Sequence, residues 1–278
     1  MSRAEDPSFT GQTVWVTGCA SGQGTRHVER FAAAGAKVAC IDTDATGLER
    51  LAKRLRSEGR TVETACADVS NWVAVTAAAE RFRRALGDVQ VVVANAGIVG
   101  DLASIESLDV TAWRRVLDVN LTGAFQTLKA AVPQLRKHSH SSVVLVASAA
   151  SFFAYPRYAA YSASKHGMIG LLRAAANELG SAGIRVNAIC PGWVDTPMLD
   201  REAAAAGLSR QQAVAEWVQD HILERLVLPD EVSDAVLWLS SDAARMVTGI
   251  ALPIDGGEIV KRGNTVADQT QAPRRDGS

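Results

Sequence analysis

The 278-residue sequence lacks a surplus of charge of either sign. It contains 29 Lys and Arg residues against 30 Asp and Glu residues, which gives a formal net charge of -1. Proteins that bind nucleic acid along a surface usually carry a clear basic excess, and an acidic block would be needed for a metal-buffering or histone-like role. We therefore expect no nucleic-acid partner and no metal site.

Long apolar runs and paired cysteines are also missing. No stretch approaches the roughly 18 apolar residues that cross a bilayer, and the start (MSRAEDP) lacks the apolar centre of a secretory signal. The four cysteines, at positions 19, 40, 66 and 190, are far apart and form no C-x-x-C pair. We expect no membrane contact, and buried free thiols in a reducing cytoplasm.

Hydrophobic residues make up 47% of the chain and charged residues 21%, the balance of a globular protein. Short apolar runs alternate with helical patterns, as in βαβ units. We predict a single-domain Rossmann-like α/β fold: a doubly wound parallel sheet of about seven strands with helices on both faces. The predicted strands are 13–17, 37–41, 61–65, 89–94, 142–147, 184–190 and 250–254. Helices are predicted after the first strand and over 45–57, 70–86, 111–137, 158–179 and 230–239.

One connection, from 191 to 229, is much longer than the others. It contains one or two helical patterns, and a long insertion after the carboxyl end of a strand often covers a ligand. We predict a tail over 1–8, a domain over 9–260 with a substrate lid at about 197–225, and a polar, flexible tail over 261–278.

A glycine-rich loop, TGCASGQG at 17–24, stands between the first strand and its helix. Glycines let the backbone approach phosphates, and the helix N-terminus offers free N–H groups to a diphosphate. Asp42 ends the second strand, where a carboxylate can accept hydrogen bonds from an adenosine ribose and would repel a 2′-phosphate. This favours NAD over NADP, although an Asp in Asp-Thr-Asp can also simply form a turn.

Tyr161 and Lys165 are four residues apart at the start of a predicted helix, so both side chains share one face. An ammonium about 4 Å from a phenol favours the phenolate by roughly 4 kcal/mol at an effective dielectric near 20. Such a contact would lower the pKa of Tyr161 from about 10 toward about 7, where a general acid/base works.

Two further polar residues follow the same logic. Ser148 ends the fifth strand, where a hydroxyl points into the ligand crevice of a parallel sheet. Asn120 is a poor helix former near Gly123, and it could mark a local break in helix 111–137 that exposes backbone groups to a water.

Together these residues resemble the short-chain dehydrogenase/reductase family over about residues 9–260. The matching positions are the loop at 17–24, Asp42, Asp68-Val69, Asn95-Ala96-Gly97, Asn120, Ser148, Tyr161, Lys165, and Pro191-Gly192 with Thr196. Gln23 departs from the pattern, since the family most often has an aliphatic residue there.

The resemblance implies a role for each of these residues. Tyr161 would be the acid/base, Lys165 would bind the nicotinamide ribose and lower the tyrosine pKa, and Ser148 would polarise the substrate oxygen. Asn120 would hold a water of a proton relay. Cofactor binding would involve Gly18, Ser21, Gly22, Gln23, Gly24, Asp42, Asp68, Val69, Asn95, Ala96, Gly97, Tyr161, Lys165, Pro191, Gly192, Val194 and Thr196.

The implied reaction is the NAD-dependent interconversion of a secondary alcohol and a ketone. An apolar, partly aromatic segment after Ser148 favours a hydrophobic or cyclic substrate, with contacts expected from Ser148, Ala150, Tyr155, Trp193 and Met198. One alternative is an NADPH-dependent 3-oxoacyl-carrier-protein reductase, against which Asp42 and Gln126 count. Another is a non-catalytic NAD-binding sensor or scaffold, which would typically have lost the tyrosine or the lysine.

We also expect a homo-oligomer, a dimer of dimers. Helices 111–137 and 158–179 carry small and apolar residues, and the family usually pairs these two helices across a dyad. The same residues could instead pack on the sheet, or both could hold. The residues are Ala124, Leu128, Ala131, Ala159, Ala160, Met168, Leu172 and Ala176.

Overall fold

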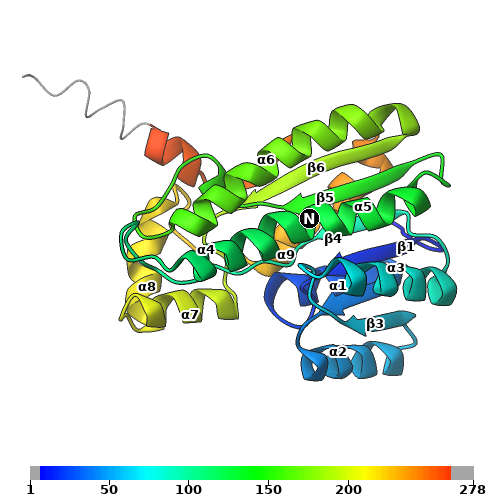
Figure 1. Cartoon of the computed structure of the whole chain (residues 1–278), viewed down its shortest axis with the longest axis horizontal. Helices are drawn as coiled ribbons and strands as arrows, with labels where there is room; N and C mark the ends of the chain where they lie inside the picture. Colours follow the sequence, from blue (N-terminus) through cyan, green and yellow to red (C-terminus); the bar gives the residue numbers. More distant parts are fainter. Residues whose placement is uncertain (1–6, 264–278) are drawn as a thin grey trace, which may run out of the picture.

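The computed structural model describes residues 7–263, which form a seven-stranded parallel sheet between two layers of helices (Figure 1). The strand order is β3-β2-β1-β4-β5-β6-β7, so the chain changes direction across the sheet between β1 and β4. The predicted doubly wound α/β sheet is confirmed. The strands are β1 (Thr13–Thr17), β2 (Lys37–Asp42), β3 (Val62–Cys66), β4 (Val91–Ala94), β5 (Ser141–Val146), β6 (Ile184–Pro191) and β7 (Ala251–Ile254).

Both faces of the sheet are buried, as the continuous apolar runs predict. On β1, Val14 and Val16 belong to the core of one face, and Trp15 between them belongs to the core of the other. The first face is covered by α1 (Gly22–Ala33), α2 (Ala45–Ser57) and α9 (Pro229–Ser240). The second is covered by α3 (Trp72–Leu86), α5 (Gly123–Leu135) and α6 (Ala159–Leu179).

The helix predicted over 111–137 is not continuous. It consists of α4 (Val110–Leu117), a π-helical turn (Asp118–Thr122) and α5. Asn120 lies in the middle of that turn, so the predicted local break is present. The break has a clear cause, because the Asn120 side chain is bonded to the backbone of a neighbouring loop: Oδ1 accepts from the Ile98 N–H at 2.8 Å and Nδ2 donates to its carbonyl at 2.9 Å.

The long connection after β6 contains two helices, α7 (Pro197–Ala205) and α8 (Arg210–Trp217). They lie together at one end of the molecule, beside the α4 end of the helical layer (Figure 1). A small core of their own holds them, and it includes Leu199, Ala203 and Trp217. The Trp217 ring also stacks on Trp193, with the ring centroids 4.2 Å apart.

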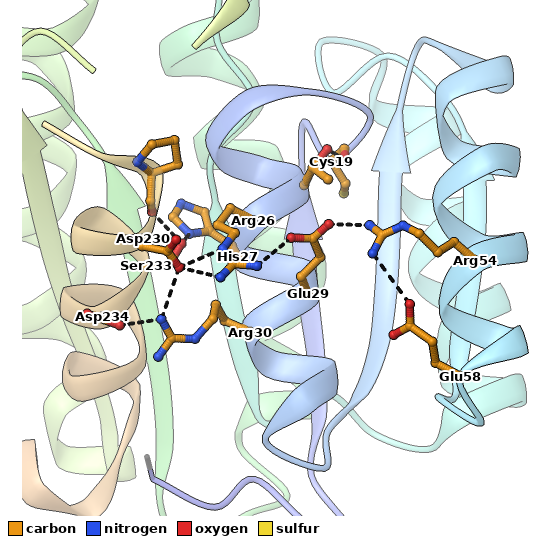
Figure 2. Close-up of polar contacts among 12 residues, drawn as sticks. Cys19, Arg26, His27, Glu29, Arg30, Arg54, Glu58, Asp230, Ser233 and Asp234 are labelled. Atoms are coloured by element: carbon orange, nitrogen blue, oxygen red, sulfur yellow. Dashed lines mark hydrogen bonds and ion pairs between the residues drawn. The ribbon is translucent and has the colours of Figure 1, made fainter. Parts of the chain in front are cut away.

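A network of charged side chains fixes α1 against α9 (Figure 2). Arg26 pairs with Asp230 at 2.6 Å, and the nearly buried Arg30 pairs with Asp234 at 2.5 Å. Between these pairs, His27 Nδ1 lies 2.8 Å from the hydroxyl of Ser233. The network holds in place the helix that begins in the glycine-rich loop.

Two expectations need correction or bounding. All four cysteines are free, but only Cys19, Cys40 and Cys190 are buried; Cys66 is exposed because it ends β3 at the edge of the sheet. Residues 1–6 and 264–278, most of the two predicted tails, lie outside the described residues. The chain is helical over 258–263, across the predicted domain end at 260. No helix among residues 7–263 is long and apolar enough to cross a membrane.

Candidate active site

A groove runs along the carboxyl ends of β1, β2 and β4, at the point where the strand order reverses. Glycine is required in its floor, because a Cβ on Gly24 would collide with the carbonyl oxygen of Gly18. Asn95 braces this turn by donating to the carbonyls of Thr17 and Gly18, each at 2.9 Å. The predicted cofactor residues in its lining are Gly18, Ser21, Gly22, Gln23, Gly24, Asp42, Asp68, Val69, Asn95, Ala96, Gly97, Tyr161, Lys165 and Thr196.

Two acidic residues lie at the end of the groove where β2 and β3 finish. Asp42 accepts hydrogen bonds from the backbone N–H of Ala20 at 2.8 Å and of Asp44 at 3.0 Å, which leaves lone pairs for a ribose hydroxyl. Asp68 pairs with Arg115 at 2.7 Å. Burial raises the pKa of Asp68, but hydrogen bonds from Ser70 and the contact with Arg115 outweigh it and hold that pKa below its usual value.

The predicted catalytic residues meet beside this groove. Lys165, buried on α6, donates from Nζ to the carbonyl of Val146 at 2.8 Å, and its Nζ lies 5.5 Å from the centroid of the Tyr161 ring. Asn120 bonds to the same helix, since its Nδ2 donates to Ser164 Oγ at 3.0 Å. A Cβ on Gly97 would lie 3.3 Å from Asn120 Oδ1 and 3.5 Å from Lys165 Nζ, so Gly97 sits between the two side chains.

The expected lowering of the Tyr161 pKa by Lys165 is not found in this structure. Burial raises the pKa of Tyr161 far above its ordinary value, and a hydrogen bond with Ser148 only partly opposes this. Burial also lowers the pKa of Lys165 to about 8. Lys165 Nζ donates to the Val146 carbonyl, and within residues 7–263 the structure shows no hydrogen bond from this ammonium to the Tyr161 phenol. Tyr161 is therefore a phenol here, the form that can donate a proton.

A second, smaller pocket adjoins the groove and shares Tyr161 with it. Ser148 and Tyr161 line it together with further aromatic rings. The centroid of the Tyr155 ring lies 5.4 Å from that of Trp193 and 5.5 Å from that of Tyr158. Pro191, Gly192 and Val194, predicted to bind the cofactor, line this pocket next to Thr196 and Met198.

Most of the expected substrate contacts lie in this second pocket, but Ala150 does not. Ser148, Tyr155, Trp193 and Met198 line it, whereas Ala150 is buried in a short helical turn outside the lining. The sequence analysis also missed Tyr158, Glu202 and Glu258. The position of Tyr158, three residues before Tyr161, is a usable signal, but nothing in the sequence indicates that the two glutamates share a pocket.

Comparisons with known proteins agree with this geometry. Residues 18–258 match the family model described as enoyl-(acyl carrier protein) reductase. The chain is 34% identical to (-)-trans-carveol dehydrogenase of Rhodococcus erythropolis over 272 residues, covering 90% of this chain and 98% of the relative. It is 36% identical to cis-4-hydroxycyclohexanecarboxylate dehydrogenase of Sinomonas cyclohexanicum over 250 residues, covering 90% and 97%.

A solved structure gives the same answer. The carveol dehydrogenase of Mycobacterium avium in complex with NAD superposes with a TM-score of 0.87 at 33% identity, covering 91% of this chain and 99% of that one. The chain belongs to the short-chain dehydrogenase/reductase family. The predicted family is thus confirmed, and so is the predicted class of activity, an oxidoreductase acting on CH–OH groups.

Proposed function

We propose that the protein is an NAD-dependent dehydrogenase that interconverts a hydrophobic or cyclic secondary alcohol and its ketone. The observation that carries this proposal is the position of Tyr161, which lines both the groove and the adjoining pocket that contains Ser148. NAD fits the groove, because Asp42 would accept from a ribose hydroxyl and repel a 2′-phosphate. The dehydrogenase activity of the two relatives on cyclic alcohols supports the same substrate class.

The proposed roles follow from the positions of the side chains. Oxidised nicotinamide, when bound, supplies the hydride acceptor. Tyr161 exchanges a proton with the substrate oxygen, and the hydroxyl of Ser148 orients that oxygen. Lys165 holds the nicotinamide ribose, and the turn around Asn120 holds a water that connects Lys165 to solvent. Because burial keeps Tyr161 protonated, ketone reduction starts from the form present here, and alcohol oxidation requires a higher pH.

The proposed setting is the cytoplasm, which the free thiols support. We also propose a dimer of dimers, in which most of the small and apolar residues expected at the interface take no part. Ala124, Leu128, Ala131, Met168 and Leu172 pack in the core on the sheet and Ala160 is also buried, whereas Ala159 and Ala176 are partly exposed. The exposed side of α5 and the adjoining end of α3 instead carry Trp72, Val73 and Phe125, which we call the α3/α5 surface.

The test is NADH against NADPH formation by the purified protein, on aliphatic, cyclic and steroidal secondary alcohols at alkaline pH. We expect turnover with NAD and not with NADP. Tyr161→Phe should lower kcat by about 10²–10⁴-fold, because it removes the proton acceptor, while NADH affinity measured by fluorescence stays nearly unchanged.

Three results would count against this. Equal turnover by Tyr161→Phe would refute the role of the phenol. Turnover with NADP alone would favour the carrier-protein reductase. NAD binding without turnover on a broad panel would favour a sensor or scaffold.

A further inference from the structure

Two carboxylates line the proposed substrate pocket. Glu202 enters it from α7, and Glu258 enters it from the segment just after β7. The described residues that line this pocket include no Arg, Lys or His. The other lining residues carry no charge. Two carboxylates in such a pocket restrict which ligands it can accept, because buried charges and unpaired acceptors are costly without a suitable ligand.

Glu258 is fully buried, and its two oxygens are in different situations. Oε1 accepts from the hydroxyl of Tyr155 and from Arg262 Nε at 3.3 Å. Arg262 approaches from behind, with its guanidinium over the rings of Phe153 and Tyr155. Oε2 has no hydrogen-bond donor among the residues that the structure describes.

His221 lies close to this oxygen, with its Nε2 3.8 Å from Oε2. That nitrogen already accepts from the backbone N–H of Trp193 at 3.2 Å, and Nδ1 donates to the carbonyl of Arg225 at 2.7 Å. With Nε2 accepting from Trp193, His221 does not donate to Glu258 from that nitrogen. Oε2 is thus the buried acceptor of a residue that lines the pocket, and no donor within residues 7–263 reaches it.

Glu202 lies closer to the reacting groups. Its Oε2 accepts from the hydroxyl of Tyr158 at 3.0 Å, and its charge contributes to the raised pKa of Tyr161. Burial raises the pKa values of Glu202 and Glu258 to about 7, so both are ionised at the alkaline pH that alcohol oxidation requires.

We propose that Glu202 and Glu258 make this pocket selective for uncharged cyclic alcohols that carry a second hydroxyl group, and exclude substrates that carry a carboxylate. The inference rests on the proposed dehydrogenase function and names the substrate class of that same site. The second hydroxyl donates to Oε2 of Glu258 when the reacting hydroxyl lies at Tyr161 and Ser148. A substrate carboxylate would lie next to two anions with no cation in the lining.

The experiment compares three substrates of one ring size: cyclohexane-1,4-diol, cyclohexanol and 4-hydroxycyclohexanecarboxylate. The full-length protein is assayed with NAD at pH 9. We expect kcat/KM for the diol to exceed that for cyclohexanol by about tenfold, the worth of one charge-assisted hydrogen bond. For the carboxylate it should fall at least about tenfold below cyclohexanol.

The matched variants are Glu202→Gln, Glu258→Gln and the double variant. Glu258→Gln keeps an acceptor for Tyr155 but should remove the advantage of the diol. The double variant should raise the carboxylate-to-cyclohexanol ratio of kcat/KM by roughly 10–100-fold. Glu49→Gln, which removes an exposed charge on α2, should leave both ratios unchanged.

Wild-type protein that uses the carboxylate as well as cyclohexanol would overturn the inference, and so would an unchanged ratio in the double variant. If none of the three compounds is oxidised, the proposed function is in doubt, and binding decides the inference separately. In the presence of NADH, the diol should raise Tm, whereas cyclohexanecarboxylate should not; equal shifts would overturn the inference.

Discussion

Asp42 is the single residue that we propose selects NAD over NADP. Its carboxylate is fixed by the backbone N–H groups of Ala20 and Asp44 and lines the groove where an adenosine ribose would lie. We predict that Asp42→Ala lowers the NAD-to-NADP ratio of kcat/KM at least about tenfold, because it removes a ribose acceptor and the repulsion of a 2′-phosphate.

Asp44→Ser is the matched control for this prediction. It removes a charge two residues away and keeps a hydroxyl that can accept from the N–H of Gly47, as the Asp44 side chain does at the start of α2. The control should retain the wild-type preference. Unchanged selectivity in Asp42→Ala would show that other groups discriminate between the two cofactors.

At the residue scale, the sequence predicts the lining of the proposed cofactor groove better than the lining of the proposed substrate pocket. The groove residues occur at fixed offsets from strand ends, and those ends converge at one edge of a parallel sheet. Glu202 comes from α7 and Glu258 from the segment after the last strand, 56 positions apart in the sequence. Only the packing of α7 against the strand ends brings them together, and no local pattern encodes it.

Nor does spacing predict which atom Lys165 bonds to, so its expected effect on the Tyr161 pKa was wrong.

The periodicity of apolar residues predicts that a helix is present and which of its faces is buried, but it does not predict whether the helix is continuous. The apolar spacing over 111–137 remains in phase across the π-helical turn, so a single helix was the natural prediction. The turn is stabilised by bonds between Asn120 and the backbone of Ile98, which belongs to a loop after β4. Such a tertiary contact overrides local propensity, and the poor helix propensity of Asn was the one local signal of the break.

The interface between α1 and α9 contains a buried histidine that makes the stability of the fold depend on pH. Burial lowers the pKa of His27 to about 3 in the folded protein. In the unfolded chain the His27 side chain has its ordinary pKa of about 6.5, so between these two values only the unfolded chain binds the proton. The contribution of His27 to the free energy of unfolding is therefore fully present above pH 6.5 and is lost as the pH falls toward 3. Between these limits the loss is about 1.4 kcal/mol per pH unit.

We predict that His27→Gln makes the free energy of unfolding less sensitive to acid. Between pH 6.5 and 4, wild-type protein should lose about 3 kcal/mol more than the variant, measured by urea unfolding at each pH. The ion pairs of Arg26 and Arg30 are present in both proteins, so their own pH dependence cancels in the difference (Figure 2). His140→Gln, at an exposed position, should behave like wild type. Parallel pH profiles for His27→Gln and wild type would refute the assignment.

For the whole molecule, the α3/α5 surface is the feature of the isolated chain that most requires explanation. Trp72, Val73 and Phe125 are 39%, 75% and 47% exposed, and Lys129 Nζ lies 5.1 Å from the Trp72 ring and 5.8 Å from the Phe125 ring. A cluster of this kind on the helices that flank the sheet fits an interface between copies of the chain. The α3/α5 surface lies on the side of the sheet opposite α1 and α9. Both proposed active-site cavities are at the strand ends, so they stay open in such an assembly.

We predict that Phe125→Glu dissociates this assembly, because it would bury a charge without a partner in an apolar contact. Light scattering after size exclusion should give about four times 29.4 kDa for wild type and a smaller multiple for the variant. Ile105→Glu, at an exposed position between β4 and α4, places the same charge outside the α3/α5 surface and should keep the wild-type mass. A monomeric wild-type protein would refute the assembly. If Phe125→Glu remains a tetramer, the interface does not lie at the α3/α5 surface. Retained turnover in a dissociated variant would show that each chain contains its complete site.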